Sequence, residues 1–243
     1  MSPQDISVKL YQSISNANEP RVYEQFHASD IAICPRAHYF KRLGIKPTSI
    51  PSGAKMLRWK AGHLIEEVIR EHVKNLYPKA LFNQRITEGG WTGEYDGYDP
   101  ESKTLISVKS VGPRAVRYRK KDEDRYHLRD NQPYPAHILQ EHAYAHLLKD
   151  EPQNILFLYI TLEGLIVPYT AKIDLLALAW VRGRVLELNE ALEARTPPAC
   201  ICREDHELYR SLLQFCDYKE EDNCCDINLT KGVESEQAQV KQV

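Results

Sequence analysis

The feature that most constrains this chain is residues 93–110, GEYDGYDPESKTLISVKS, which reads as two short extended runs joined by a turn. Leu105, Ile106 and Val108 give the second run the apolar and β-branched character of a strand. Asp96 ends the first run, and Lys109 lies near the end of the second. Pairing of the two runs would place a metal-binding carboxylate beside a fixed ammonium. A divalent metal on that carboxylate and the ammonium together offset the negative charge that builds on the phosphorane oxygens during phosphodiester hydrolysis. An ordinary charged surface hairpin has the same residue pattern and stays open as the alternative.

The length and charge of the chain narrow the classes of protein to consider. A chain of 243 residues is long enough for one large domain with a buried core. Its formal net charge of −2 limits any contact with nucleic acid to a local basic surface. No apolar run approaches membrane-spanning length, and residues 1–20 are too polar for a signal peptide. We therefore expect a cytoplasmic protein with no membrane segment.

Hydrophobic periodicity predicts the main helices and strands. The clearest helix covers residues 57–77 and has an apolar face that we expect to be buried. His63, Glu67 and Arg70 follow at helical spacing along a polar stripe beside that face. The same reasoning predicts helices at 135–149 and 171–194, and strands at 81–87, 154–160 and 164–170.

A basic segment follows the predicted hairpin. Between Lys109 and Asp130 the chain has eight basic and four acidic residues, although the whole chain is net negative. Basic residues mixed with tyrosines suit a single nucleic-acid strand, because phosphates bind Arg and Lys while bases stack on Tyr. The residues expected to bind DNA here are Arg114, Arg117, Arg119 and Lys120. A solvated loop without a ligand is the competing interpretation.

The cysteines are crowded near the C-terminal end. Five of the six lie in the 26-residue window 200–225, and only Cys34 lies elsewhere. In a reducing compartment such a cluster more often binds metal than forms disulfides. The sequence therefore predicts metal binding by these cysteines.

Five separated motifs occur in an order that resembles the RecB-like branch of the PD-(D/E)XK nucleases. They are CPR with Cys34, GH with His63, GEYDG with Asp96, ISVKS with Lys109, and QEHAY with Gln140 and Tyr144. The similarity is to the iron–sulfur members of that branch, such as the CRISPR-adaptation exonucleases, the AddB nuclease domain and exonuclease V. It covers roughly residues 28–225.

The resemblance implies a role for each motif. His63 and Asp96 would bind a catalytic Mg²⁺ or Mn²⁺, and Lys109 would orient or activate the attacking water. Gln140 and Tyr144 would contact DNA near the site.

The resemblance also implies a four-iron (4Fe-4S) cluster that ties the two ends of the chain together. Its ligands would be Cys34, Cys202, Cys216 and Cys224, with Cys200 and Cys225 as alternates and zinc as the alternative metal.

Ser107 departs from the family pattern, which has Asp or Glu two residues before the lysine. A serine hydroxyl at this metal-binding position is a poor Mg²⁺ ligand beside a carboxylate. Glu67 is the expected substitute and a catalytic residue, since it shares a helix face with His63, and Glu94 and Asp99 are weaker candidates. A loss of catalysis and an engineered serine are the other interpretations.

Together these features predict an α/β fold: a restriction-endonuclease-like core with a central mixed sheet flanked by helices. The expected divisions are an N-terminal extension at 1–27, the nuclease domain at 28–225 and a disordered tail at 226–243. The expected function is a metal-dependent DNA nuclease, an exonuclease acting on single-stranded ends. The alternative is an inactive nuclease-fold protein that binds DNA or serves as an assembly subunit. Protein partners in a recombination, repair or CRISPR-like complex are a further implication.

Overall fold

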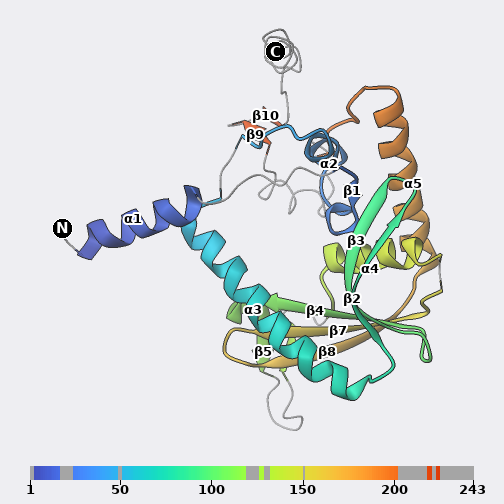
Figure 1. Ribbon diagram of the computed structural model, residues 1–243, viewed down its shortest axis with the longest axis horizontal. Coiled ribbons are helices and arrows are strands. Elements are labelled where there is room, and N and C mark those ends of the chain that lie inside the picture. The colour runs from blue at the N-terminus through green and yellow to red at the C-terminus, as the bar shows by residue number, and fades with distance from the viewer. Residues whose placement is uncertain are drawn as a thin grey trace, which may run out of the picture.

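The computed structural model describes residues 3–16, 24–48, 51–118, 126–128, 132–149, 151–201, 218–220 and 223–224. Its centre is a six-stranded mixed sheet (Figure 1). Five of its strands follow the order β1-β3-β4-β7-β8, and the sixth, β2, pairs with β3. The strands of this sheet are β1 (Phe26–His27), β2 (Leu81–Glu88), β3 (Trp91–Asp99), β4 (Thr104–Val111), β7 (Asn154–Thr161) and β8 (Ile166–Lys172). The prediction of an α/β fold with a central mixed sheet is confirmed.

The strand pairing follows from the connections. Short turns make β2–β3, β3–β4 and β7–β8 antiparallel. In contrast, β4 and β7 run parallel in register from the pair Thr104–Asn154 to the pair Val111–Thr161. Parallel neighbours need a crossover connection, and helix α4 (Pro135–Leu147) lies within it. The sheet is therefore built around one strand–helix–strand unit with antiparallel strands at both sides.

Helices α3 (Gly53–Leu76) and α4 lie on opposite faces of β4. Ser107 reaches α4, where its hydroxyl bonds to Glu141, whereas Ser110 packs against Gly62 of α3. Side chains an odd number of positions apart on a strand point to opposite faces, which agrees with this arrangement. Helix α5 (Leu175–Glu193) packs against α4 and against α2 (Pro35–Arg42).

Polar caps fix the starts of the long helices. The Ser52 side chain accepts a hydrogen bond from the Lys55 amide at 3.3 Å at the start of α3. Asp174 does the same for the Leu176 amide at 2.8 Å at the start of α5. Each cap satisfies an amide that the first turn of a helix leaves unpaired.

The sheet also includes residues assigned above to the N-terminal extension. Strand β1 pairs in parallel with the start of β3, Phe26 opposite Trp91 and His27 opposite Thr92. The rings of Phe26 and Trp91 lie 5.1 Å apart in the buried core. Helix α1 (Pro3–Asn16) precedes this strand and contacts α3.

The expectation that the apolar face of α3 is buried was wrong. The apolar stripe of α3 is not buried: Leu57, Leu64 and Val68 are exposed. The helix turns its Gly62 and Glu66 side toward β4 instead, so polar residues face the sheet. The basic segment after β4 contains the short helix η2 (Pro113–Ala115) and a hairpin of β5 (Val116–Tyr118) and β6 (Tyr126–Leu128). The predicted tail at 226–243 lies outside the described residues.

No helix in the described part of the chain has both the length and the apolarity needed to cross a membrane.

Candidate active site

The candidate site forms where β3 separates from β4. The ladder between the two strands covers only Gly97 to Asp99 on β3, so Asp96 is the first residue beyond it. Strand β4 continues to Val111. Along the edge that faces β3, two of its backbone amides donate hydrogen bonds to side chains, because no strand in the described part of the chain pairs with β4 there. Val108 N donates to Asp96 Oδ2 at 2.9 Å, and Ser110 N donates to Glu66 Oε1 at 2.7 Å. These bonds satisfy backbone donors that would otherwise lack a partner, and they hold two carboxylates along one strand edge.

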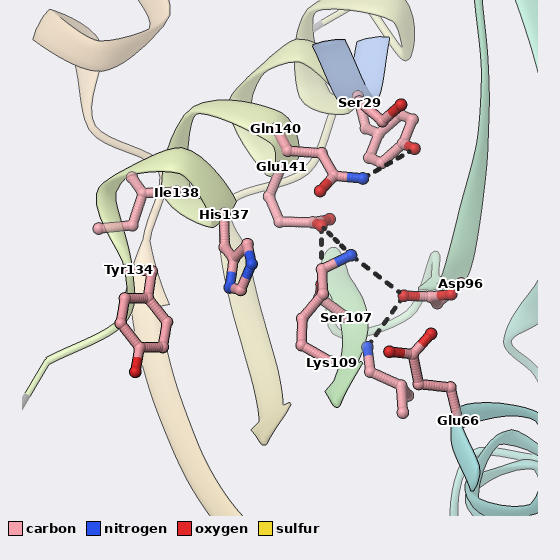
Figure 2. Close-up of polar contacts among 12 residues, drawn as sticks. Ser29, Glu66, Asp96, Ser107, Lys109, Tyr134, His137, Ile138, Gln140 and Glu141 are labelled. Atoms are coloured by element: carbon pink, nitrogen blue, oxygen red, sulfur yellow. Dashed lines mark hydrogen bonds and ion pairs between the residues drawn. The ribbon is translucent and has the colours of Figure 1, made fainter. Parts of the chain in front are cut away.

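Lys109 lies between two acidic side chains, as Figure 2 shows. Its Nζ atom is 3.6 Å from Asp96 Oδ2 and 3.7 Å from Glu141 Oε1. Ser107, two positions earlier on the same face of β4, donates its hydroxyl to Glu141 Oε1 at 2.7 Å. Strand alternation therefore directs both β4 side chains toward α4, where Glu141 joins them.

Burial and mutual charge set the ionisation of this group. The Glu141 side chain is 1% exposed, and burial raises its pKa to about 7 against the opposing effects of Lys109 and Ser107. Burial would lower the pKa of Lys109, but the carboxylates of Asp96 and Glu141 outweigh it and raise that pKa above its ordinary value. Lys109 is therefore a permanent cation near neutral pH, while Glu141 exchanges its proton in that range.

Helix α3 supplies a second set of polar side chains. Arg70 Nη1 donates to Asp96 Oδ1 at 2.7 Å. His63 Nδ1 lies 3.5 Å from Glu66 Oε2, and its side chain is 75% exposed. Gly62 allows α3 to lie close to β4, because a Cβ atom at this position would come within 2.4 Å of the Ser110 hydroxyl.

Helix α4 is fixed beside the site by aromatic contacts. Tyr159 on β7 pairs with Lys109, and its hydroxyl contacts Tyr134 N at 3.2 Å and His137 Nδ1 at 3.1 Å. Burial, with the charge of Lys109 adding to it, lowers the pKa of His137 to about 3, so this ring is neutral. The start of α4 is thereby tied to the strand next to β4.

Gln140 and Tyr144 form the next polar pair along α4. Gln140 Nε2 donates to the Tyr144 hydroxyl at 3.2 Å. Tyr144 is buried against β3, where a Cβ atom on Gly93 would come within 2.5 Å of its ring. A glycine in the GEYDG motif therefore lets this tyrosine approach the strand that supplies Asp96.

The structure thus brings together Asp96, Ser107 and Lys109, with Gln140 and Tyr144 on the neighbouring helix. His63 lies at the exposed edge of the site and contacts Glu66. Glu67 is exposed, and Glu66 faces the strand edge in its place. Successive helical residues are about 100° apart, so a shift of one position decides which carboxylate faces the sheet.

The sequence interpretation missed two acidic residues, Glu66 and Glu141. Glu141 carried a signal, because it is the only Asp, Glu, Lys or Arg in the whole of α4. A single carboxylate in an otherwise uncharged and mostly buried helix is costly unless it has partners, and such a group is a candidate for function.

The basic residues expected to bind DNA are only partly covered by the description. Arg114 in η2 and Arg117 in β5 are exposed. Arg119 and Lys120 lie outside the described residues.

The carboxylates of the site are of a type that binds Mg²⁺ or Mn²⁺, but their present arrangement does not form a metal site. Asp96, Glu66 and Glu141 offer hard oxygen donors, which these cations prefer. Within the described ranges, however, no three His, Cys, Asp or Glu side chains form a group arranged to hold a metal ion. Arg70 and Lys109 are the cations that contact Asp96.

Cys34 lies beside one of the C-terminal cysteines. Cys34, at the start of α2, is buried, and its Sγ atom lies 3.9 Å from that of Cys200. Cys202, Cys216 and Cys225 lie outside the described residues, and Cys224 is described only through its backbone in β10 (Asn223–Cys224). Cys200, which was an alternate ligand, is therefore the C-terminal cysteine seen beside Cys34.

Two residues from the C-terminal part of the chain contact α2 and the residues that follow it. Tyr218 is buried, its hydroxyl donates to Ile45 O at 2.9 Å, and its ring lies 5.5 Å from that of Phe40. Arg36 Nε, in the first turn of α2, donates to Pro198 O at 2.8 Å. These contacts therefore hold Pro198 and Tyr218 against α2 and the residue Ile45 that follows it.

Comparison with known proteins gives matches only among solved structures. No protein-family model matches the chain, and no curated protein does. The crystal structure of SSO0001 is similar, with 16% sequence identity, a TM-score of 0.47, and coverage of 89% of this chain and 98% of that one. So is the alkaline exonuclease LHK-Exo from Laribacter hongkongensis, with 14% identity, a TM-score of 0.48, and coverage of 77% and 93%. A phage-related exonuclease from Haemophilus somnus 129PT has 14% identity, a TM-score of 0.41, and coverage of 70% and 96%. At these identities and TM-scores we base functional conclusions on the residues of the site alone.

Proposed function

We propose that this chain is a DNA nuclease that hydrolyses phosphodiester bonds with the help of Mg²⁺ or Mn²⁺. The observation that supports it best is the position of Lys109, whose ammonium lies 3.6 Å from Asp96 and 3.7 Å from Glu141. The proposal assigns the chain to the RecB-like branch of the PD-(D/E)XK nucleases and gives it exonuclease activity on single-stranded DNA ends. It rests on the order of the sequence motifs and on the side chains that the fold brings together.

Lys109 has a defined part in this chemistry. Its raised pKa keeps it protonated, so it donates hydrogen bonds and does not accept a proton from water. A fixed ammonium at the strand edge holds a water or a phosphate oxygen in place and offsets negative charge that develops on the phosphate. A divalent cation held by Asp96 with Glu66 or Glu141 would add Lewis acidity and lower the pKa of a bound water.

Glu141 takes the place of the acid that is absent at position 107. It approaches Lys109 from α4, whereas the family pattern places its acid on the strand itself. The Ser107 hydroxyl holds Glu141 Oε1 at 2.7 Å, so the serine positions the substitute carboxylate. On this proposal Ser107 is compatible with catalysis, and Glu141 replaces Glu67 as the third acid.

The proposed DNA-binding residues lie beside these groups. Gln140 and Tyr144 are on the same helix as Glu141, and the bond from Gln140 to the buried Tyr144 would hold the Gln140 side chain in position for contact with a strand. Arg114 and Arg117 are exposed cations on the chain that continues from β4. Gln140 and the two arginines are proposed to contact the substrate, the arginines through backbone phosphates, with Tyr144 supporting Gln140 from below the surface.

We further propose that Cys34 and Cys200 bind a metal centre with two of the remaining C-terminal cysteines. The 4Fe-4S cluster and zinc are both candidates. Two thiolates on one tetrahedral zinc ion lie about 3.8 Å apart, given Zn–S bonds of about 2.3 Å. The observed 3.9 Å between the sulfur atoms supports a shared metal and matches the zinc alternative in its spacing. Iron, sulfide and zinc analysis of protein purified without oxygen distinguishes the two, and protein with neither metal would contradict the proposal.

The experiment for the nuclease proposal uses single- and double-stranded DNA labelled at either end, with Mn²⁺, Mg²⁺ or EDTA. We expect metal-dependent release of short products from single-stranded ends. Asp96→Asn and Lys109→Met should each abolish that release while leaving the fold intact. A parent protein that binds DNA but cleaves none with either metal would leave only the binding or assembly function.

A further inference from the structure

Arg70 is the most unusual polar side chain of the site. It lies on α3 and is 19% exposed, and its Nη1 atom donates to Asp96 Oδ1 at 2.7 Å. Its Nε atom is buried and has no hydrogen-bond partner among the residues that the structure describes. Since buried donors are nearly always paired, this guanidinium has an unused donor inside the site.

A structural ion pair explains only half of this geometry. It would tie α3 to β3 through Asp96, but it would not leave a buried donor unused. The same carboxylate also accepts a hydrogen bond from Val108 N at 2.9 Å and lies 3.6 Å from Lys109. Asp96 therefore has three partners, while Arg70 still has a donor to spare.

The charges of the site place Arg70 in competition with a divalent cation. Asp96, Glu66 and Glu141 supply the carboxylates, and Lys109 and Arg70 are the two cations that contact Asp96. A guanidinium bound to Asp96 Oδ1 occupies an oxygen that a cation needs, and like charges on one carboxylate repel each other. A divalent cation bound at that oxygen would therefore displace Arg70 from Asp96.

A released arginine beside Lys109 has an obvious ligand in a nuclease. The planar guanidinium matches the oxygens of a phosphate in two-point contacts, and its Nε–H is one of the donors that make them. The flexible side chain of Arg70 begins on a rigid helix next to the proposed phosphate site, so a change of rotamer is enough to redirect it.

We propose that Arg70 exchanges partners during DNA binding. It pairs with Asp96 in the chain alone, and it moves to a phosphate oxygen of the DNA when Asp96 holds a divalent cation. This inference rests on the proposed nuclease function and extends it, because it makes cation binding and DNA binding cooperative through one side chain.

The test measures binding rather than cleavage. Calorimetry with Mn²⁺ alone gives the cation affinity, and fluorescence anisotropy with single-stranded DNA in Ca²⁺ or EDTA gives the effect of a cation on DNA affinity. Arg70→Met should bind Mn²⁺ about tenfold more tightly than the parent, since a competing charge is gone. It should also lose most of the gain in DNA affinity that Ca²⁺ gives the parent.

Two further variants make the result decisive. Arg58→Met removes an exposed cation about 18 Å earlier on the same helix, and it should match the parent in both measurements. Arg70→Lys keeps the charge but lacks the planar fork, so it should bind Mn²⁺ like the parent and show a weaker effect of Ca²⁺ on DNA affinity. This variant decides the question if Arg70→Met does not fold.

Arg70 variants that match the parent in Mn²⁺ affinity, or in the effect of Ca²⁺ on DNA affinity, would overturn the inference alone. A parent protein that binds neither Mn²⁺ nor DNA would overturn the proposed function and the inference with it.

Discussion

Replacing Glu141 with Gln should change how the stability of the metal-free protein depends on pH. Burial raises the pKa of Glu141 from 4.5 to about 7 in the folded chain. Between these two values the folded state holds a proton that the unfolded state has lost. The free energy of unfolding therefore falls as pH rises through that interval, and the full loss is present above pH 7.

The size of this effect follows from the width of the interval. One proton over roughly 2.5 pH units, at about 1.4 kcal/mol per unit, amounts to about 3 kcal/mol. Lys109 does not titrate in this range, because its pKa is raised above its ordinary value. His137 and His38, whose pKa values burial lowers to about 3, give an opposite dependence that both proteins share. The difference between parent and variant thus isolates Glu141.

The assay is urea unfolding of both proteins in EDTA at intervals from pH 4.5 to 7.5. Relative to the parent, Glu141→Gln should gain about 3 kcal/mol across the series. Glu67→Gln, which removes an exposed carboxylate, should run parallel to the parent. Parallel curves for the parent and Glu141→Gln would refute the claim that Glu141 is buried beside Lys109 with a raised pKa.

Three further predictions test other parts of the structure. Ser107→Ala removes the donor to Glu141 Oε1 and should cost about 1–3 kcal/mol of unfolding free energy at pH 7.5, measured in urea; no loss would show that the bond does not support the carboxylate. Tyr218→Ala should cost about 3–5 kcal/mol and Tyr218→Phe only about 1 kcal/mol, because the phenylalanine keeps the contact with Phe40 and loses the bond to Ile45 O; equal losses would argue against a packed ring. Replacing Arg114 and Arg117 together with Ala should reduce the slope of log affinity for single-stranded DNA against log salt by about 1.4, and an unchanged slope would remove these residues from the DNA-binding surface.

Much of the fold could be predicted from local patterns in the sequence. The hairpin at residues 93–110 appears as β3 and β4, with Asp96 and Lys109 side by side. Apolar runs of strand length gave β7 and β8, and their mixed sheet with flanking helices was expected. These features depend on residues close in sequence, or on a spacing that strands and helices impose directly.

Only the residues of the site that lie on strands β3 and β4 could be predicted from the sequence. Which side of α3 faces β4 depends on packing over a long range, and the choice between Glu66 and Glu67 turns on one helical position. Glu141 comes from a helix after β4 in sequence, and its approach to Ser107 exists only once α4 crosses back over the sheet. The pairing of Cys34 with Cys200 has the same origin, since 166 positions separate the two residues.

The central claim is that Glu141 on α4 supplies the acid that position 107 lacks. The most direct test compares Mn²⁺-dependent cleavage of end-labelled single-stranded DNA by the parent, Glu141→Gln and Glu67→Gln. Glu141→Gln should lose cleavage by at least about 100-fold, the scale of one positioned catalytic group, while Glu67→Gln should cleave like the parent. Full activity in Glu141→Gln, or its loss in Glu67→Gln alone, would contradict the account.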